Sequence, residues 1–312
     1  MTTLKQSARP SRSRLRQEGM GYTVFTVVNT ILLILICIIT IYPMYYVVIA
    51  SISEADVLGR NFGLLLVPVG KLNTYSYQLV FRNSLVLSGF VNTFFILVAG
   101  LCFNMVLTCL GAYFLALKGS MLSRPIAMLI LFTMYFSGGI IPTFLWIRDL
   151  HMLDTIWAIV LPTSLSVYNM IVMRTYFANQ IPGELHEAAM LDGCGDFRFL
   201  YGIVLPLSGP ILAVIALYYA VAMWNAYFSA MIYISTRAKL PLPNFLREIL
   251  LLNMVNGMEG NLNDLENLAK MEQRAELMKY SLIIVASLPV MLLYPFVQKY
   301  FVKGVMIGAV KG

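Results

Sequence analysis

The sequence predicts an all-α integral membrane protein with six transmembrane helices. Of the 312 residues, 59% are hydrophobic and only 12% are charged, and the mean hydropathy is +0.78. At least six apolar stretches reach the length of about 20 residues that a helix needs to cross roughly 30 Å of hydrocarbon. Strands are excluded because open sheets leave backbone groups unpaired in lipid, and because the stretches lack the alternating pattern of a barrel.

The apolar stretches define the expected spans. They cover residues 21–50, 88–117, 125–147, 155–173, 207–235 and 280–298. The first stretch is expected to remain in the protein, because it is longer than the apolar core of a signal peptide and has no small-residue cleavage pattern. Pro43 lies within it and removes one backbone hydrogen bond, which predicts a bend in the first helix.

The amino-terminal segment predicts the orientation. Residues 1–19 contain five Lys or Arg side chains and a single acid, Glu18, and basic residues of short segments stay on the cytoplasmic side. A cytoplasmic amino terminus followed by six crossings places both termini in the cytoplasm. The formal net charge of +7 suits attraction to anionic membrane lipid at that surface, and no array of basic and aromatic residues indicates nucleic-acid binding.

The expected spans contain no Asp, Glu, Lys, Arg or His. A proton-coupled carrier usually needs such a residue within the membrane, so secondary transport is disfavoured, although sodium coupling through backbone carbonyls stays open. The chain has no G-x-x-x-x-G-K-[ST] sequence for ATP binding, and neither histidine stands in a metal or catalytic-triad pattern. We therefore expect no catalytic or metal site, and expect the energy for transport to come from another polypeptide.

A polar island between the fourth and fifth spans predicts a short helix at the inner surface. Pro182 suits the first turn of a helix, and Glu184 and Glu187 complement its positive end. Gly193 and Gly195 then end the helix after about ten residues.

One face of this predicted helix combines a leucine, two small residues and an acid at helical spacing: Leu185, Ala188, Ala189 and Asp192. Small side chains would let the helix approach a partner closely. Asp196 is expected to cap a second short helix that runs to a boundary at Pro206. Periodicity alone favours an ordinary inner loop with an amphipathic helix.

The residue pattern of the island resembles the coupling loop of permease subunits in bacterial binding-protein-dependent ABC importers. Seven positions match at that family's spacing: Glu187, Ala188, Ala189, Gly193, Ile203, Leu205 and Pro206. The preceding residues 181–185, with Glu184 among them, look like the family's usual lead-in, while His186 stands where an acid is common. The resemblance implies that the first short helix inserts into a cleft on a separate ATPase subunit, which holds ATP and magnesium, and that this chain holds no cofactor.

The carboxyl end narrows the resemblance. Residues 304–312 resemble the tail of the second permease in maltose-type carbohydrate importers, which reaches between the two ATPases, and residues 135–142 look like the oligosaccharide branch. The resemblance implies a bacterial plasma-membrane importer with a second permease, two ATPases and an external solute-binding protein that delivers a sugar. It divides the chain into a flexible basic head, 1–19, a permease domain, 20–303, with the coupling loop at 181–206, and the tail.

Aromatic and amide side chains within the spans are the candidates for contact with a sugar. Aromatic faces pack against the C–H surfaces of sugars, and amides bond to their hydroxyls. The candidates are Tyr135 in the third span and Trp224, Asn225, Tyr227 and Phe228 in the fifth. For any one of these residues, packing within the protein is the commoner role.

An outer segment, residues 236–279, contains an amphipathic pattern at 262–269. It predicts a surface helix that either docks an extracellular protein or rests on the membrane. Three other functions stay open. The chain could be a permease for an amino acid, amine or phosphate. It could also be an ion-coupled secondary carrier or channel, or a non-transporting assembly or sensory subunit.

Overall fold

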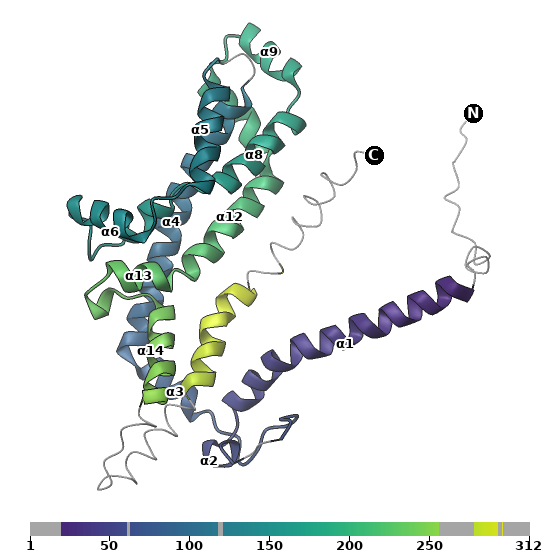
Figure 1. Cartoon of the computed structure of the whole chain (residues 1–312), viewed down its shortest axis with the longest axis vertical. Helices are drawn as coiled ribbons and strands as arrows, with labels where there is room; N and C mark the ends of the chain where they lie inside the picture. Colours follow the sequence, from purple (N-terminus) through teal and green to yellow (C-terminus); the bar gives the residue numbers. More distant parts are fainter. Residues whose placement is uncertain (1–19, 61–62, 118–120, 256–277, 293–294, 296–312) are drawn as a thin grey trace. The chain divides into compact units, whose positions relative to one another are not determined.

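The computed structural model describes residues 20–60, 63–117, 121–255, 278–292 and 295 (Figure 1). In this part of the chain every regular element is a helix, which confirms the all-α fold class. The basic head, the tail and the predicted amphipathic helix at 262–269 lie outside the described residues. The chain divides into two units, Met1–Asn73 and Thr74–Gly312, and each is described by itself.

The first unit contains one long apolar helix. Helix α1 runs from Met20 to Ser51 with Pro43 inside it, and it is long and apolar enough to cross a membrane. A hydroxyl within it bonds to the helix's own backbone, since Thr26 Oγ1 donates to the carbonyl of Tyr22 at 2.9 Å. Such bonds satisfy hydroxyl groups that would otherwise face lipid unpaired. The one-turn helix α2 (Ala55–Leu58) follows.

The second unit is built around helix α4, which runs from Ser84 to Ala116. Three glycines, Gly89, Gly100 and Gly111, are separated by 11 residues each. Because 11 residues make about three full helical turns, the three glycines lie on nearly the same face of α4.

Each of these glycines receives a side chain from a different helix. A Cβ atom at the three positions would lie 2.8 Å from the ring of Phe245, 2.7 Å from Met223 Sδ and 2.7 Å from Met170 Sδ, respectively. These side chains come in turn from α14 (Leu242–Val255), α12 (Gly209–Trp224) and α8 (Val167–Gln180). Helices α8, α12 and α14 lie beside α4 (Figure 1), and the glycines allow their side chains to approach its backbone closely. A smaller cluster joins Val80 of α3 (Tyr75–Arg82) to α14.

The third expected span is sharply bent. Helices α5 (Ser123–Tyr135) and α6 (Ile140–Asp149) meet at an angle of 111°, where one continuous helix over 125–147 was predicted. The backbone of Gly139 has φ 85°, a left-handed conformation that glycine adopts without steric cost. This glycine allows the chain to turn between the two helices.

The fourth and fifth expected spans are also interrupted. In the fourth, α7 (Trp157–Val160) and the 3₁₀ turn η2 (Leu161–Thr163) are separated from α8 by residues 164–166. In the fifth, α12 ends before Asn225, and α13 (Tyr227–Tyr233) follows. Two described helices are long and apolar enough to cross a membrane, or up to four if each sharply bent pair is one span. The six-span count therefore stays a prediction.

Asp154 ties the loop after α6 to the connection between α13 and α14. Its Oδ1 accepts hydrogen bonds from the backbone amides of Ser235 at 3.1 Å and Thr236 at 2.8 Å. Its Oδ2 accepts from Thr236 Oγ1 at 2.7 Å and from Lys239 Nζ at 2.6 Å. The Lys239 bond, followed by those from Thr236, holds the pKa of the Asp154 carboxyl well below its usual range. We call this group the Asp154 corner.

Candidate functional site

The polar island folds as the predicted helix. Helix α9 runs from Gly183 to Leu191, with Pro182 at its N-cap and Glu184 in its first turn. The chain then turns through Gly193, whose φ is 72°, and the amide of Cys194 donates to the carbonyl of Ala189 at 2.9 Å. This left-handed ending satisfies the last carbonyls of the helix. The predicted limits of α9 at Pro182 and Gly193 are confirmed.

The second predicted helix differs at both ends. Its N-cap is Gly195, so Asp196 is the first residue of α10 (Asp196–Phe199) and not the cap. The helical path continues through a π turn, η3 (Leu200–Val204), into α11 (Leu205–Leu207). Pro206 is no boundary, because it lies in the first turn of α11, where its missing N–H costs little.

The bend to the fifth span follows Pro206 by two residues. It lies at Ser208, and the run Asp196–Leu207 meets α12 there at 87°. Residues 183–208, the predicted coupling segment, thus form a short helix, a second helical run and a sharp corner into α12.

Two residues of α9 that were predicted to face a partner, Leu185 and Ala189, instead face the protein's own bundle. Ala189 is buried and Leu185 half-buried, and both pack into the core formed by α4, α8 and α12. The opposite side is exposed: Glu187 and Ala188 face solvent, and Leu191 is 90% exposed. The two small residues therefore do different things, because Ala189 lets α9 lie close to its own bundle while Ala188 stays on the free surface.

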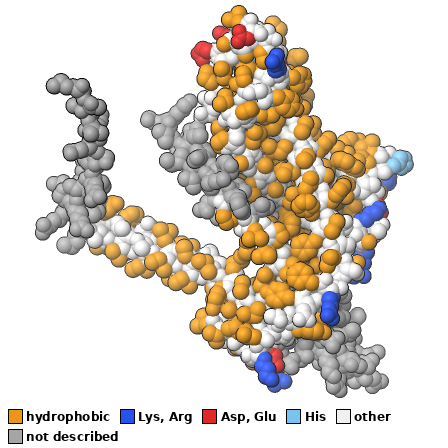
Figure 2. All heavy atoms as spheres, turned by 180° about the vertical axis from the view of Figure 1, so that it is seen from behind, with side chains coloured by type: hydrophobic (Ala, Val, Ile, Leu, Met, Phe, Trp, Pro, Cys, Tyr) orange, Lys and Arg blue, Asp and Glu red, His pale blue; other side chains and the backbone are white. Residues whose placement is uncertain are grey.

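Large apolar side chains join the free surface from the next helix. Phe197 of α10 is 72% exposed, and Tyr201 and Met190 are also exposed. Figure 2 shows acidic and apolar side chains together at this end of the unit. Sequence reasoning missed Leu191 and Phe197, although the signal was present: Leu191 lies about 200° around the helix from Ala189, so burial of one exposes the other.

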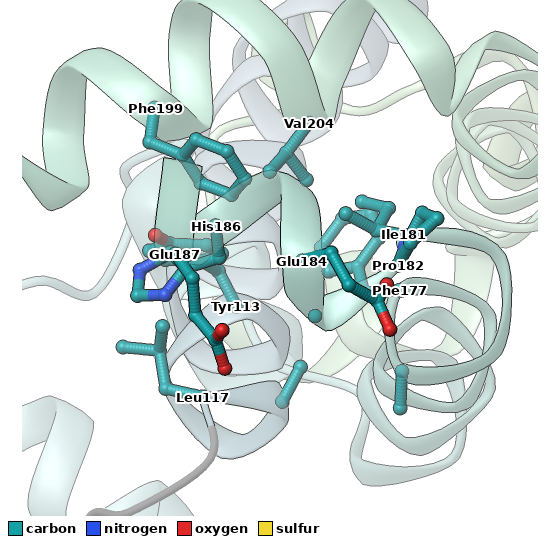
Figure 3. A pocket seen from close by; sticks show the side chains of 13 residues that line it. Tyr113, Leu117, Phe177, Ile181, Pro182, Glu184, His186, Glu187, Phe199 and Val204 are labelled. Carbon is teal, nitrogen blue, oxygen red and sulfur yellow. The ribbon is translucent and has the colours of Figure 1, made fainter. Parts of the chain in front are cut away.

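A hollow of about 350 Å³ lies beside the first turn of α9 (Figure 3). Its lining includes the aromatic side chains of Tyr113, Phe177 and Phe199, which come from α4, α8 and α10, and the carboxylates of Glu184 and Glu187 from α9. Both glutamates are exposed, and neither makes an ion pair with another described residue. The site thus offers a partner two free negative charges next to an apolar hollow.

One polar pair connects α9 to α10. His186 Nε2 lies 3.2 Å from Asp196 Oδ1, and the edge of the imidazole meets the ring of Phe199 with centroids 4.9 Å apart. Asp196 therefore pairs with a residue of α9, and the N-cap position of α10 is taken by Gly195, which has no side chain to cap the helix.

The remaining coupling candidates face the bundle. Ile203 and Leu205 are half-buried against the core of the unit, while Pro206 is exposed. Of the eight predicted coupling residues, three therefore hold the segment to the bundle, namely Ala189, Ile203 and Leu205. The other five are exposed: Glu184, Glu187, Ala188, Gly193 and Pro206.

Four of the five pathway candidates lie together at the break between α12 and α13. Trp224 is half-buried, with its ring centroid 6.4 Å from that of Phe90. Asn225 Nδ2 donates to the carbonyl of Val221 at 2.9 Å.

The next two candidates, Tyr227 and Phe228, are exposed and meet edge to face with centroids 6.3 Å apart. Tyr135 stands in a different place, at the end of α5 before the bend, and is exposed. The four candidates from the fifth span thus lie together because they are close in sequence, whereas Tyr135 lies at the bend between α5 and α6.

Comparison with known proteins gives similarity along nearly the whole chain. Residues 110–307 match the family model described as a binding-protein-dependent transport system inner membrane component. The polygalacturonan/rhamnogalacturonan transport system permease protein YtcP of Bacillus subtilis (strain 168) is 37% identical over 281 residues, which cover 90% of this chain and 96% of that protein. Protein LplC of the same organism is 37% identical over 290 residues, 93% of this chain and 95% of its own.

A solved structure gives the same result for the fold. In the crystal structure of a bacterial ABC transporter involved in the import of the acidic polysaccharide alginate, one chain superposes with a TM-score of 0.81 at 31% sequence identity. The match covers 91% of this chain and 99% of that chain.

Proposed function

The chain belongs to the family of binding-protein-dependent transport system inner membrane components, and from this premise we propose that it imports an oligosaccharide or related glycan fragment. Members of this family are permease subunits of ABC importers and not enzymes. They lie in the membrane and work with a partner permease, an ATPase and a solute-binding protein. The chain is accordingly a membrane transport subunit, and ATP is hydrolysed on another subunit.

The proposed substrate class rests on one observation, the similarity over nine-tenths of the chain to proteins named for polysaccharide transport. The names of these relatives specify polygalacturonan/rhamnogalacturonan and alginate, which are rich in uronic acids. We therefore propose uronic-acid oligosaccharides as the first substrates to test. An amino acid, amine or phosphate has no such support.

The proposed topology has six spans and two cytoplasmic termini. It counts α5 with α6, α7 with α8, and α12 with α13 as single interrupted spans, and adds α1, α4 and the last apolar stretch. The basic head supports a cytoplasmic amino terminus. With this topology α9 lies in the cytoplasm, within reach of an ATPase.

The proposed coupling surface is the exposed side of α9 with the start of α10. Glu187, Ala188 and Leu191 would enter a cleft on the ATPase, and Phe197 would extend the apolar contact. Two features support this: these side chains are exposed although two of them are large and apolar, and such side chains mark interaction sites. ATP and magnesium belong to two ATPase subunits, and this chain holds no cofactor.

The proposed cycle transmits motion through the corner at Ser208. When the ATPases close, α9 moves with them, and the run Asp196–Leu207 carries the motion into α12. Exposed polar and aromatic groups at the α12–α13 break, Asn225, Tyr227 and Phe228, suit contact with sugar hydroxyls and C–H faces. Trp224 would support them from the bundle side, and Tyr135 would contact sugar at the other bend.

The test is uptake by the whole importer in proteoliposomes, with ATP on the cytoplasmic side and the solute-binding protein outside. We expect ATP-dependent uptake of labelled oligogalacturonate or oligoalginate, and no uptake when the ATPase carries an inactive catalytic site. Uptake by this chain alone, driven by a sodium gradient, would instead identify a secondary carrier. Uptake of an amino acid, and of no glycan, would overturn the substrate class.

A further inference from the structure

The interruption at residues 164–166 is a partly exposed segment at the side of the bundle, and some of its backbone groups have no helical partner. Such groups need a hydrogen bond where water is absent. Here two of them are satisfied by side chains from other helices: the amide of Ser166 donates to the hydroxyl of Tyr219 at 3.0 Å, and the carbonyl of Thr163 accepts from Asn104 Nδ2 at 3.3 Å. The interruption is thus held by α4 and α12.

Tyr219 is the centre of this arrangement. Its hydroxyl also lies 2.7 Å from Thr108 Oγ1 of α4. Thr108 is completely buried, and Tyr219 nearly so. The phenol oxygen therefore joins three pieces of the chain, α4, α12 and the start of α8, at one buried point where an unpaired hydroxyl would be costly.

The Tyr219 hydroxyl joins two helices that both lead to the predicted coupling segment. Ser166 is the N-cap of α8, and α8 leads at its other end to α9. Tyr219 lies in α12, which begins where the coupling segment ends. Helices α8 and α12 are thus two arms that extend from the coupling segment, and the Ser166–Tyr219 bond joins them about 15 Å along α12 from its first residue.

We infer that Tyr219, together with Thr108, is a positioning residue that holds these two arms together, so that a movement of α9 displaces α8, α12 and the interruption as one body. We call the contact the Tyr219 latch. The inference rests on the proposed coupling role of α9. Tyr219 contacts neither the coupling surface nor the α12–α13 break, and it acts only through the helices it joins. Without the hydroxyl the arms separate under load, and part of the ATPase movement is lost before it reaches the pathway.

The latch is tested with Tyr219→Phe in the whole importer, because this change keeps the ring and removes only the hydroxyl. We expect the complex to assemble and hydrolyse ATP at the wild-type rate, while the amount of sugar imported per ATP hydrolysed falls about fivefold, as for loss of one buried hydrogen bond. Thr108→Val removes only one of the two bonds of the phenol oxygen and should have a smaller effect, and Thr108→Ser should have none. Tyr218→Phe is the matched control, because this neighbouring ring is 39% exposed and lies on another side of α12.

The combined variant separates a latch from two independent effects. Tyr219→Phe with Thr108→Val should lose no more than Tyr219→Phe alone, because that change already removes the bond to Thr108. The inference is overturned by an unchanged import-to-hydrolysis ratio in Tyr219→Phe, by additive losses, or by equal loss of assembly, hydrolysis and import, which indicates a purely structural residue. Failure of the proposed function looks different, since the wild-type importer would then show no ATP-driven uptake.

Discussion

The Asp154 corner and the α9 corner of the second unit are held in opposite ways. At the Asp154 corner one carboxylate accepts four hydrogen bonds from Ser235, Thr236 and Lys239, and the turn is fixed by charge. At the α9 corner, among the described residues, the His186–Asp196 pair is a single polar contact at 3.2 Å, and apolar packing holds most of the helix. The first corner has its polar groups satisfied within the chain, whereas the second leaves two carboxylates and several large apolar groups for a partner.

The difference indicates which corner is built to receive force. A turn held by several short charged bonds resists displacement, and it keeps the α6–α7 loop against the α13–α14 connection. A helix held mainly by Ala189 and its neighbours can move with a docked partner while its inner face stays packed. The following four predictions test this contrast, from the largest expected effect on docking or stability to the smallest.

The largest effect is expected from Leu191→Asp. A charge at this exposed apolar position should weaken association with the ATPase by about 30-fold, the loss typical of an interface hot spot, while the melting temperature of the isolated permease stays unchanged. Co-purification of the ATPase and ATP-driven uptake measure the effect. Leu191→Met is the matched control and should behave as wild type. Normal docking of the Leu191→Asp protein would show that the partner uses another surface.

A smaller effect is expected from Gly193→Ala. A Cβ atom meets no neighbour there, so the cost comes only from the left-handed backbone, about 1 kcal/mol. The end of α9 should loosen, and uptake should fall by a factor of about five. Gly193→Asn should retain most activity, since asparagine tolerates this conformation. Equal losses in both variants would point to a contact at Gly193 and not to its backbone.

Asp154→Asn should affect the stability of the Asp154 corner without affecting the α9 corner. We expect a lower melting temperature because the Lys239 pair is lost, with ATPase docking unchanged. The sign of the pH dependence follows from the lowered pKa of Asp154: the stabilisation is fully present above an ordinary aspartate pKa of about 4 and is lost as the pH falls below that value. The wild-type melting temperature should therefore approach that of Asp154→Asn in acid. A constant difference between the two proteins down to low pH would contradict this account.

The smallest effect is expected from His186→Gln. The pair with Asp196 is partly exposed, and such pairs contribute about 0–1 kcal/mol. Hydrogen exchange of the α9 amides should speed up slightly, with uptake close to wild type. His186→Glu should have a larger effect, because it sets a negative charge against Asp196. If His186→Gln abolished docking, the histidine itself would be a contact of the ATPase.

The contrast also explains what the sequence could predict. The limits of α9 were predictable because a proline start and a glycine stop act locally. The burial of Leu185 and Ala189 against the bundle was not predictable, because periodicity identifies the residues that share a helix face but not the surface that covers that face. Asp196 was misassigned for a related reason: its side chain is bound by His186, a residue of another helix.

The interruptions were harder to predict than the spans. Gly139 offered a local signal for the bend between α5 and α6, and Ser166, which caps α8, offered one for the second break. The contacts of that break with Tyr219 and Asn104 come from distant segments and could not be predicted. The packing role of the three α4 glycines was likewise not predictable from the length of the apolar stretch, because it depends on side chains from three other helices that lie against them.

Those three glycines have a consequence for how the subunit works. Side chains of Phe245, Met223 and Met170 are inserted into α4 at heights 11 residues apart, so α14, α12 and α8 cannot slide along it without being withdrawn. The inserted side chains oppose sliding along α4, and the bond of the Ser166 amide to Tyr219 adds a direct tie between α8 and α12. In the proposed transport cycle this unit would rotate against a partner permease, and the seam between the two subunits would be the moving gate.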